Sequence, residues 1–270
     1  MNIYMKHNLK IISILLGLFL LAQFVGLLVT SSYIQVDDLP LGIERPEVNE
    51  KTSFVPIFIF ILIATALVFV LLRFKLFRLW KLWFLLSVFF CLTVSFAAFV
   101  TDFIAIILGV ILAVWKLFKP NVIIHNLTEL FIYGALAAIF APLLGLYSAI
   151  ILLILISVYD YIAVCKTKHM VEMAQSQEKA KVFAGLLVPY GKNTAILGGG
   201  DIGFPLLFSG VVMTHFGLGL FDWQVYLIPI FSGLGLLYLF LWGDGKKFYP
   251  AMPFITVGCL IALGLVFLFT

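Results

Sequence analysis

The amino-acid sequence predicts an all-α, polytopic membrane protein with nine transmembrane helices, its N-terminus in the cytoplasm and its C-terminus outside. Of the 270 residues, 64% are hydrophobic and only 11% are charged, whereas an ordinary soluble domain carries about 25% charged residues. So few charges cannot cover a water-facing surface, which excludes a soluble globular protein, a disordered chain and a nucleic-acid-binding domain. Nine apolar runs approach the roughly 20 residues that a spanning helix needs.

The apolar runs follow one another along the whole chain. The first follows Lys6 and Lys10, and it is longer than the roughly 7–15 residues of a signal-peptide core, so we interpret it as a span. The fourth run is short, and we expect it to extend to Phe118 while Lys116 snorkels to the interface. Pro142 separates the fifth run from the sixth. The predicted spans are Leu9–Val29, Phe54–Leu72, Leu82–Val100, Phe103–Trp115, Val122–Ala141, Leu143–Cys165, Thr194–Phe216, Gln224–Trp242 and Pro250–Phe269.

The basic residues orient these spans. With nine crossings and a cytoplasmic N-terminus, fifteen of the seventeen Lys and Arg residues fall on or beside the inner segments, and only Arg45 and Lys51 fall outside. This distribution obeys the positive-inside rule. An eight-helix count would move some basic loops to the other side, so the charges favour nine. The same pattern divides the chain into an N-terminal six-helix part (1–165), a cytoplasmic loop (166–193) and a C-terminal three-helix part (194–270).

Three acidic residues lie within the predicted spans, namely Glu129, Asp160 and Asp201, while the other ten of the thirteen lie in loops. A charge at the bilayer centre costs roughly 2.5–3.5 kcal/mol even on the mildest scale. Such residues are therefore candidates for function, either in catalysis or in an ion pathway. Glu129 lies near the inner end of the fifth span, where structural hydrogen bonds are the better interpretation.

Asp160 and Asp201 are predicted to lie at a similar depth. Asp160 is about five residues from the inner end of the sixth span, or about 8 Å, and Asp201 is about seven residues into the seventh, or about 10 Å. Two carboxylates in one low-dielectric site do not both ionise readily, so the pair is expected to share a proton near neutral pH. The ionised member then activates a water, and the protonated member hydrogen-bonds a scissile carbonyl.

Glycine and proline flank this pair. The run Gly198-Gly199-Gly200 before Asp201 is a poor helix interior, because each glycine costs roughly 1 kcal/mol relative to alanine. Glycines there permit close approach of a substrate strand or of a neighbouring helix. The run Pro250-Ala251-Met252-Pro253 opens the last span, where proline suits a helix start.

At these residues the sequence resembles the presenilin and signal peptide peptidase family of intramembrane aspartyl proteases. The matching pieces are Tyr159-Asp160, Gly198-Gly199-Gly200-Asp201 (the family's GxGD) and Pro250-Ala251-Met252 (the family's PAL, with Met for Leu), all in family order. Since the inner loop lacks the long insertion of presenilins, the chain is most similar to compact microbial presenilin-like homologues. The basic residues favour the presenilin orientation.

The resemblance implies a role for each matching residue. Asp160 and Asp201 would be the catalytic pair. The residues that shape the site and bind substrate would be Tyr159, Gly198, Gly200, Pro250, Ala251, Met252 and Pro253. The apolar segment 183–188 is a candidate edge for a substrate strand, because an unwound substrate needs backbone partners in lipid. Replacing Leu186 with Pro would then impair cleavage without affecting folding.

The resemblance also implies the partners. We expect transmembrane substrates, single-span or signal-peptide-like, and membrane lipid, but no nucleic acid, metal or organic cofactor. We expect a plasma-membrane location if the protein is microbial. The sequence carries no signal for an oligomeric state or an accessory subunit. The main alternative is a proton- or ion-coupled transporter or channel that uses the same carboxylates, with Glu129 extending a relay.

Overall fold

The computed structural model describes residues 9–34, 36, 38–44, 52–74, 76–166, 183–191, 193–243 and 249–270. Nine α-helices lie within these residues: α1 (Leu9–Ser31), α2 (Phe54–Arg73), α3 (Phe77–Ala97), α4 (Asp102–Phe118), α5 (Val122–Phe140), α6 (Leu146–Tyr161), α8 (Gly199–Phe216), α9 (Leu227–Trp242) and α10 (Met252–Phe269). Seven of them are long and apolar enough to cross a membrane, judged by length and composition. The prediction of a mainly helical, multi-pass membrane protein is confirmed; the count of nine spans stays a prediction.

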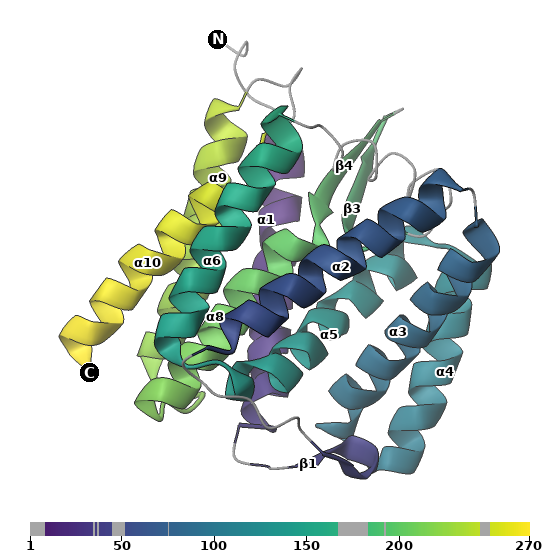
Figure 1. Cartoon of the computed structure of the whole chain (residues 1–270), viewed down its shortest axis with the longest axis horizontal. Helices are drawn as coiled ribbons and strands as arrows, with labels where there is room; N and C mark the ends of the chain where they lie inside the picture. The colour runs from purple at the N-terminus through teal and green to yellow at the C-terminus, as the bar shows by residue number, and fades with distance from the viewer. Residues whose placement is uncertain are drawn as a thin grey trace.

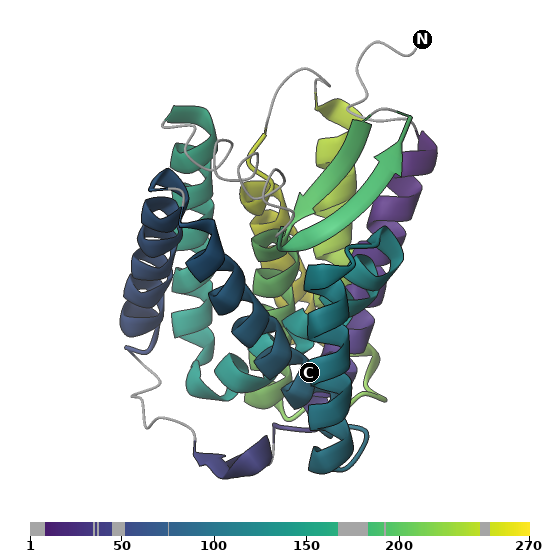
Figure 2. The same ribbon diagram turned by 90° about the vertical axis from the view of Figure 1, so that its right-hand side faces the viewer.

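Helix α8 lies at the centre of the bundle, packed against α1, α5, α6, α9 and α10 (Figures 1 and 2). Its sequence contains Asp201, Pro205 and several glycines, so it is less apolar than the surrounding helices. A helix enclosed by protein does not need a lipid-soluble surface all round. Its buried side chains belong to the same core as those of the helices around it.

Helices α2, α3 and α4 lie to one side of this core (Figure 1). Helix α3 packs on α4 and α5, and a second apolar cluster between them includes Trp80, Phe84 and Leu92. Helix α2 exposes most of its length and contacts α6 and α3. It is therefore the least enclosed of the helices next to α6.

Two short antiparallel hairpins add to the helices. Strands β1 (Asp38–Leu39) and β2 (Ile43–Glu44) flank a 3₁₀ turn at Pro40–Gly42. Strands β3 (Gly185–Tyr190) and β4 (Asn193–Gly198) form the longer hairpin, in which Leu186 is opposite Leu197. The last residue of β4 directly precedes α8, so this hairpin leads the chain into the central helix (Figure 2).

The predicted start of the seventh span at Thr194 is wrong, because residues 193–198 form strand β4 and the helix begins at Gly199. Asp201 is therefore in the first turn of α8, and not two turns inside a helix. The physical reason is twofold: three successive glycines disfavour helix, and the apolar residues before them pair with β3 instead.

Other predicted boundaries agree more closely. The short 3₁₀ helix Ala141–Leu143, which contains Pro142, separates α5 from α6 as predicted, and α4 extends to Phe118.

The predicted snorkelling of Lys116 is wrong, because this side chain is buried and its Nζ atom lies 2.6 Å from Glu129 Oε1. The predicted inner loop lies largely outside the described residues, as do ten of the basic residues used for orientation: Lys6, Arg45, Lys51, Lys75, Lys168, Lys179, Lys181, Lys192, Lys246 and Lys247.

Candidate active site

Asp160 lies in the last turn of α6 and is buried. Its Oδ2 atom accepts a hydrogen bond of 3.1 Å from the backbone N–H of Met252, which follows Ala251 at the start of α10. This amide lies at the N-terminal end of the helix, where the helix dipole is positive. Asp160 is thus oriented by the first turn of another helix.

The proline-flanked run builds that helix start. Helix α10 begins at Met252, and Pro253 lies in its first turn, where the missing N–H has no helical partner to lose. Pro250, Ala251 and Met252 are all buried. The structure therefore brings the backbone of Met252 into contact with Asp160, and the role of these residues in shaping the site stays a prediction.

Asp201 is the third residue of α8 and is half-buried. Gly198 is the N-cap of this helix and makes no side-chain cap hydrogen bond. A Cβ atom on Gly199 would lie 2.7 Å from the Tyr133 hydroxyl and 3.3 Å from the Ala184 carbonyl oxygen, so a side chain there would require Tyr133 or the turn to shift. A Cβ on Gly200 would meet only the Phe204 ring, at 3.5 Å.

Gly199 is thus the most restricted glycine of the run, although the sequence pointed to Gly198 and Gly200. A Cβ on Gly198 would lie 3.3 Å from Asp201 Oδ2, which is tight but involves only a side chain. The partner that restricts Gly199 is Tyr133 on α5, far away in sequence. No local pattern could have identified this contact.

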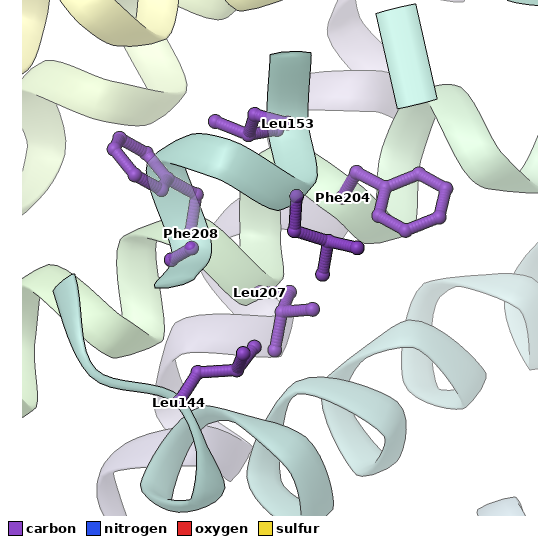
Figure 3. A pocket seen from close by; sticks show the side chains of 7 residues that line it. Leu144, Leu153, Phe204, Leu207 and Phe208 are labelled. Atoms are coloured by element: carbon purple, nitrogen blue, oxygen red, sulfur yellow. The ribbon is translucent and has the colours of Figure 1, made fainter. Parts of the chain in front are cut away.

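Helices α6 and α8 pack closely and run antiparallel (Figure 1). Between them lies a small apolar pocket of about 10 Å³, lined by Leu153 of α6 and by Phe204, Leu207 and Phe208 of α8 (Figure 3). This pocket is too small and too apolar to bind substrate. It shows instead that the two helices are in contact just beyond the candidate aspartates, so Asp160 and Asp201 lie at the same end of the pair.

Tyr159 lines a second space, between α6 and α2. Its side chain lines a groove of about 230 Å³ together with Leu62, Thr65, Ala66 and Phe69 of α2. The groove is almost entirely apolar. Tyr159, which lines it, directly precedes Asp160 in the sequence. The groove is large enough for part of an apolar side chain or backbone segment.

The outer edge of β3 is already occupied by side chains of α5. Asn126 accepts from Leu187 N at 3.0 Å and donates to Leu187 O at 2.7 Å, as a neighbouring strand would. Gly185 N donates to Glu129 Oε2 at 3.0 Å, and His125 Nε2 donates to Gly185 O at 2.7 Å. The prediction that segment 183–188 offers a free edge to a substrate is therefore wrong.

Strand β4 has the available edge. In the register of this hairpin, the N–H and C=O groups of Thr194 and Ile196 point away from β3. In the part of the chain that the structure describes, these outward groups have no hydrogen-bond partner. The unpaired edge ends at Gly198, three residues before Asp201.

Three comparisons place these features among known proteins. A family model described as signal-peptide peptidase, presenilin aspartyl protease matches residues 16–199, which is more than half of the 270 residues. Among curated proteins, no relative matches the chain in sequence.

Two solved structures have a similar fold. A structure of a presenilin family intramembrane aspartate protease in space group C222 matches with a TM-score of 0.69 and 18% identity, covering 96% of this chain and 99% of the other. A structure of a presenilin family intramembrane aspartate protease in space group P2 matches with a TM-score of 0.64 and 17% identity, covering 95% of this chain and 97% of the other.

Proposed function

Because the chain belongs to the signal-peptide peptidase and presenilin family of aspartyl proteases, we propose that Asp160 and Asp201 are the carboxylates with which it hydrolyses peptide bonds. The chain is an intramembrane aspartyl protease and an integral, multi-pass membrane protein. The family match covers Asp160 but ends before Asp201 and before the start of α10. The roles proposed for those later residues rest on geometry and on the motifs themselves.

The placement of the two aspartates is the observation that carries this proposal. Asp160 comes from the proposed N-terminal part, residues 1–165, and Asp201 from the proposed C-terminal part, residues 194–270. They lie at the same end of the antiparallel pair α6 and α8. Met252 N–H holds the Asp160 carboxylate, so the start of α10 is part of the same site.

The proposed chemistry uses the two carboxylates as one unit. The ionised carboxylate takes a proton from a water, whose oxygen attacks the scissile carbonyl carbon, while the protonated partner donates a hydrogen bond and then its proton to the carbonyl oxygen. The resulting tetrahedral intermediate collapses when the now protonated carboxyl gives its proton to the amide nitrogen, the other carboxylate takes a proton from a hydroxyl of the intermediate, and the C–N bond breaks, which leaves the pair with one proton again. The proton moves within the pair, so the roles belong to the dyad and not to either residue.

The substrate is proposed to be a transmembrane helix, single-span or signal-peptide-like, that unwinds near the site. Unwound backbone in lipid needs hydrogen-bond partners. The outward groups of Thr194 and Ile196 supply such partners by strand addition. The apolar groove beside Tyr159, between α6 and the exposed α2, is the proposed side of entry from the bilayer.

The orientation in the membrane follows from charge. The ends of α2, α4 and α6 and the start of α3 lie on the side of the bundle that carries the β3–β4 hairpin (Figure 1), and these are the ends at or next to which the sequence places Arg73, Lys119, Lys166 and Arg78. The positive-inside rule supports placing that side in the cytoplasm. We therefore propose nine spans with the N-terminus in the cytoplasm, and a plasma-membrane location if the protein is microbial.

The decisive experiment reconstitutes the purified protein in liposomes with a single-span substrate. Wild type cleaves, and both Asp160→Asn and Asp201→Asn abolish cleavage, because asparagine keeps the size of the side chain but cannot exchange the proton. Cleavage that survives either substitution rules out the dyad. Ion flux that is lost in the same variants, without any cleavage by wild type, would favour the transporter instead.

A further inference from the structure

A buried polar cluster links α4 and α5 to the hairpin that leads to Asp201. Lys116 Nζ lies 2.6 Å from Glu129 Oε1 and 2.9 Å from Thr128 Oγ1, and the two charged side chains are 3% and 1% exposed. Two charges so deeply buried are costly unless each is paired and fully hydrogen-bonded. The pair meets this condition, because Thr128 and Glu129 both bond the Lys116 ammonium group.

The second carboxylate oxygen of Glu129 faces the hairpin and α8. Glu129 Oε2 accepts a hydrogen bond from the Tyr133 hydroxyl and one of 3.0 Å from Gly185 N. Lys116 neutralises the charge on the other oxygen. Glu129 thus joins the start of β3 to Tyr133 by a single side chain.

Gly185 is held through its backbone, because its conformation admits no side chain. Its φ angle is +142°, and a Cβ there would lie 2.2 Å from the Leu197 carbonyl oxygen. Its neighbour Ala184 accepts a hydrogen bond of 3.1 Å from Gly199 N, in the first turn of α8. The start of β3 is therefore tied at one side to Glu129 and at the other to the turn that carries Asp201.

Tyr133 contacts the same turn directly. The hydroxyl and ring edge of Tyr133 lie against Gly199, and its Cδ1 atom lies 3.5 Å from where a Cβ on Gly203 would be. These glycines stand two residues before and two residues after Asp201. The three glycines 198–200 that precede Asp201 have no side chains to fix their position, so the position of this turn depends on such outside contacts.

We propose that Glu129 and Tyr133 are positioning residues for Asp201, with Lys116 as the counter-ion that keeps the Glu129 carboxylate in place. The proposal rests on the proposed function of Asp201. The network sets where the first turn of α8 lies relative to α6, and hence the geometry of the two carboxylates. All three side chains are buried, so they act through the position of Asp201.

The first test compares two buried tyrosines. Tyr133→Phe removes the hydroxyl that bonds Glu129. Tyr33→Phe is the matched control, because Tyr33 is also buried and its hydroxyl donates a hydrogen bond of 2.8 Å to Val94 O. Tyr33 lies just after the C-terminal end of α1. Misplacement of a reacting group by about 1 Å costs up to about 100-fold in rate. We expect Tyr133→Phe to lower kcat roughly 10- to 100-fold with KM, as a substrate-to-lipid ratio, unchanged.

The control separates positioning from stability. Tyr33→Phe is expected to lower the thermal unfolding midpoint about as much as Tyr133→Phe while leaving kcat at the wild-type value. Equal kcat values for Tyr133→Phe and wild type overturn the proposal, and so does an equal loss of kcat in both variants. A raised KM with unchanged kcat also overturns it, because Tyr133 would then act in substrate binding.

The second test uses the charge pair and does not depend on Tyr133. Lys116→Met leaves Glu129 buried without its counter-ion, whereas the double variant Lys116→Met/Glu129→Gln leaves a neutral side chain that still accepts from Gly185 N. We expect kcat to fall in Lys116→Met and to recover in part in the double variant. Additive losses, with no recovery, contradict the counter-ion role.

The two proposals fail in different ways. If wild type does not cleave, or if Asp201→Asn still cleaves, the proposed function itself is wrong. If the aspartate variants are inactive while Tyr133→Phe and the charge-pair variants cleave at the wild-type rate, the dyad stands and only the positioning network is refuted.

Discussion

The Oδ2 atom of Asp160 accepts a hydrogen bond of 3.1 Å from the backbone N–H of Met252, 92 residues later in the chain. This contact places the start of α10 against the end of α6. The Met252 side chain is buried in the core. It therefore influences the site by fixing the position of its own backbone N–H, which bonds Asp160.

We therefore expect Met252→Ala and Met252→Leu to differ sharply. Alanine leaves a cavity at a residue that is 2% exposed, which costs about 2–5 kcal/mol and allows the first turn of α10 to shift away from Asp160. Leucine has a similar volume and costs less than about 1.5 kcal/mol. Thermal unfolding in detergent and initial cleavage rates measure both effects; equal rates for the two variants would contradict this role.

A second prediction concerns the glycine run. Gly199→Ala is expected to abolish or strongly reduce cleavage, because its Cβ would lie 2.7 Å from the Tyr133 hydroxyl and would displace the turn that carries Asp201. Gly264→Ala in α10 is the control, since a Cβ there would meet nothing within 4 Å and Gly264 lies outside the site. Cleavage rates at equal expression decide the matter, and an active Gly199→Ala variant would show that the close contact is not needed.

A third prediction tests the open edge of β4. Ile196→Pro removes the outward N–H without removing a hydrogen bond of the hairpin, because Ile196 does not donate to β3 in this register. Strand β3 already contains Pro189 at such a position. We expect the variant to fold and to lose most cleavage.

The matched control for that edge is Leu197→Pro. Leu197 lies opposite Leu186 at a hydrogen-bonded position, so proline there disrupts the hairpin and lowers the unfolding midpoint as well. If Ile196→Pro cleaves like wild type, the substrate does not pair with β4. Leu186→Pro, first considered as a test of a free edge on β3, would for the same reason damage folding and test nothing about substrate.

A fourth prediction concerns pH. A dyad that shares one proton is active only when one carboxyl is protonated and the other ionised, so kcat should pass through a maximum and fall on both sides. Cleavage in liposomes across a pH series measures this, with the unfolding midpoint at each pH as the control for stability. A rate that rises steadily with pH would mean that a single base, and not a shared proton, limits the reaction.

The helices were predictable from sequence because lipid imposes one rule on every span. A backbone in hydrocarbon must satisfy its own hydrogen bonds, so an apolar run of sufficient length becomes a helix wherever it occurs. The break at Pro142 and the extension of α4 to Phe118 follow from local residues as well. Asp160 and Asp201 stood out because charge within a span is rare and costly.

What the sequence alone determined is therefore the apolar helices, the candidate aspartates and the order of the three motifs, all of which depend on residues close together in the chain. Only the tertiary structure decided that residues 193–198 form a strand, that Lys116 pairs with Glu129, and that α5 occupies the edge of β3 and leaves the edge of β4 open. Each of these depends on which distant groups meet, and a buried polar group is satisfied by whichever partner the packing brings within reach.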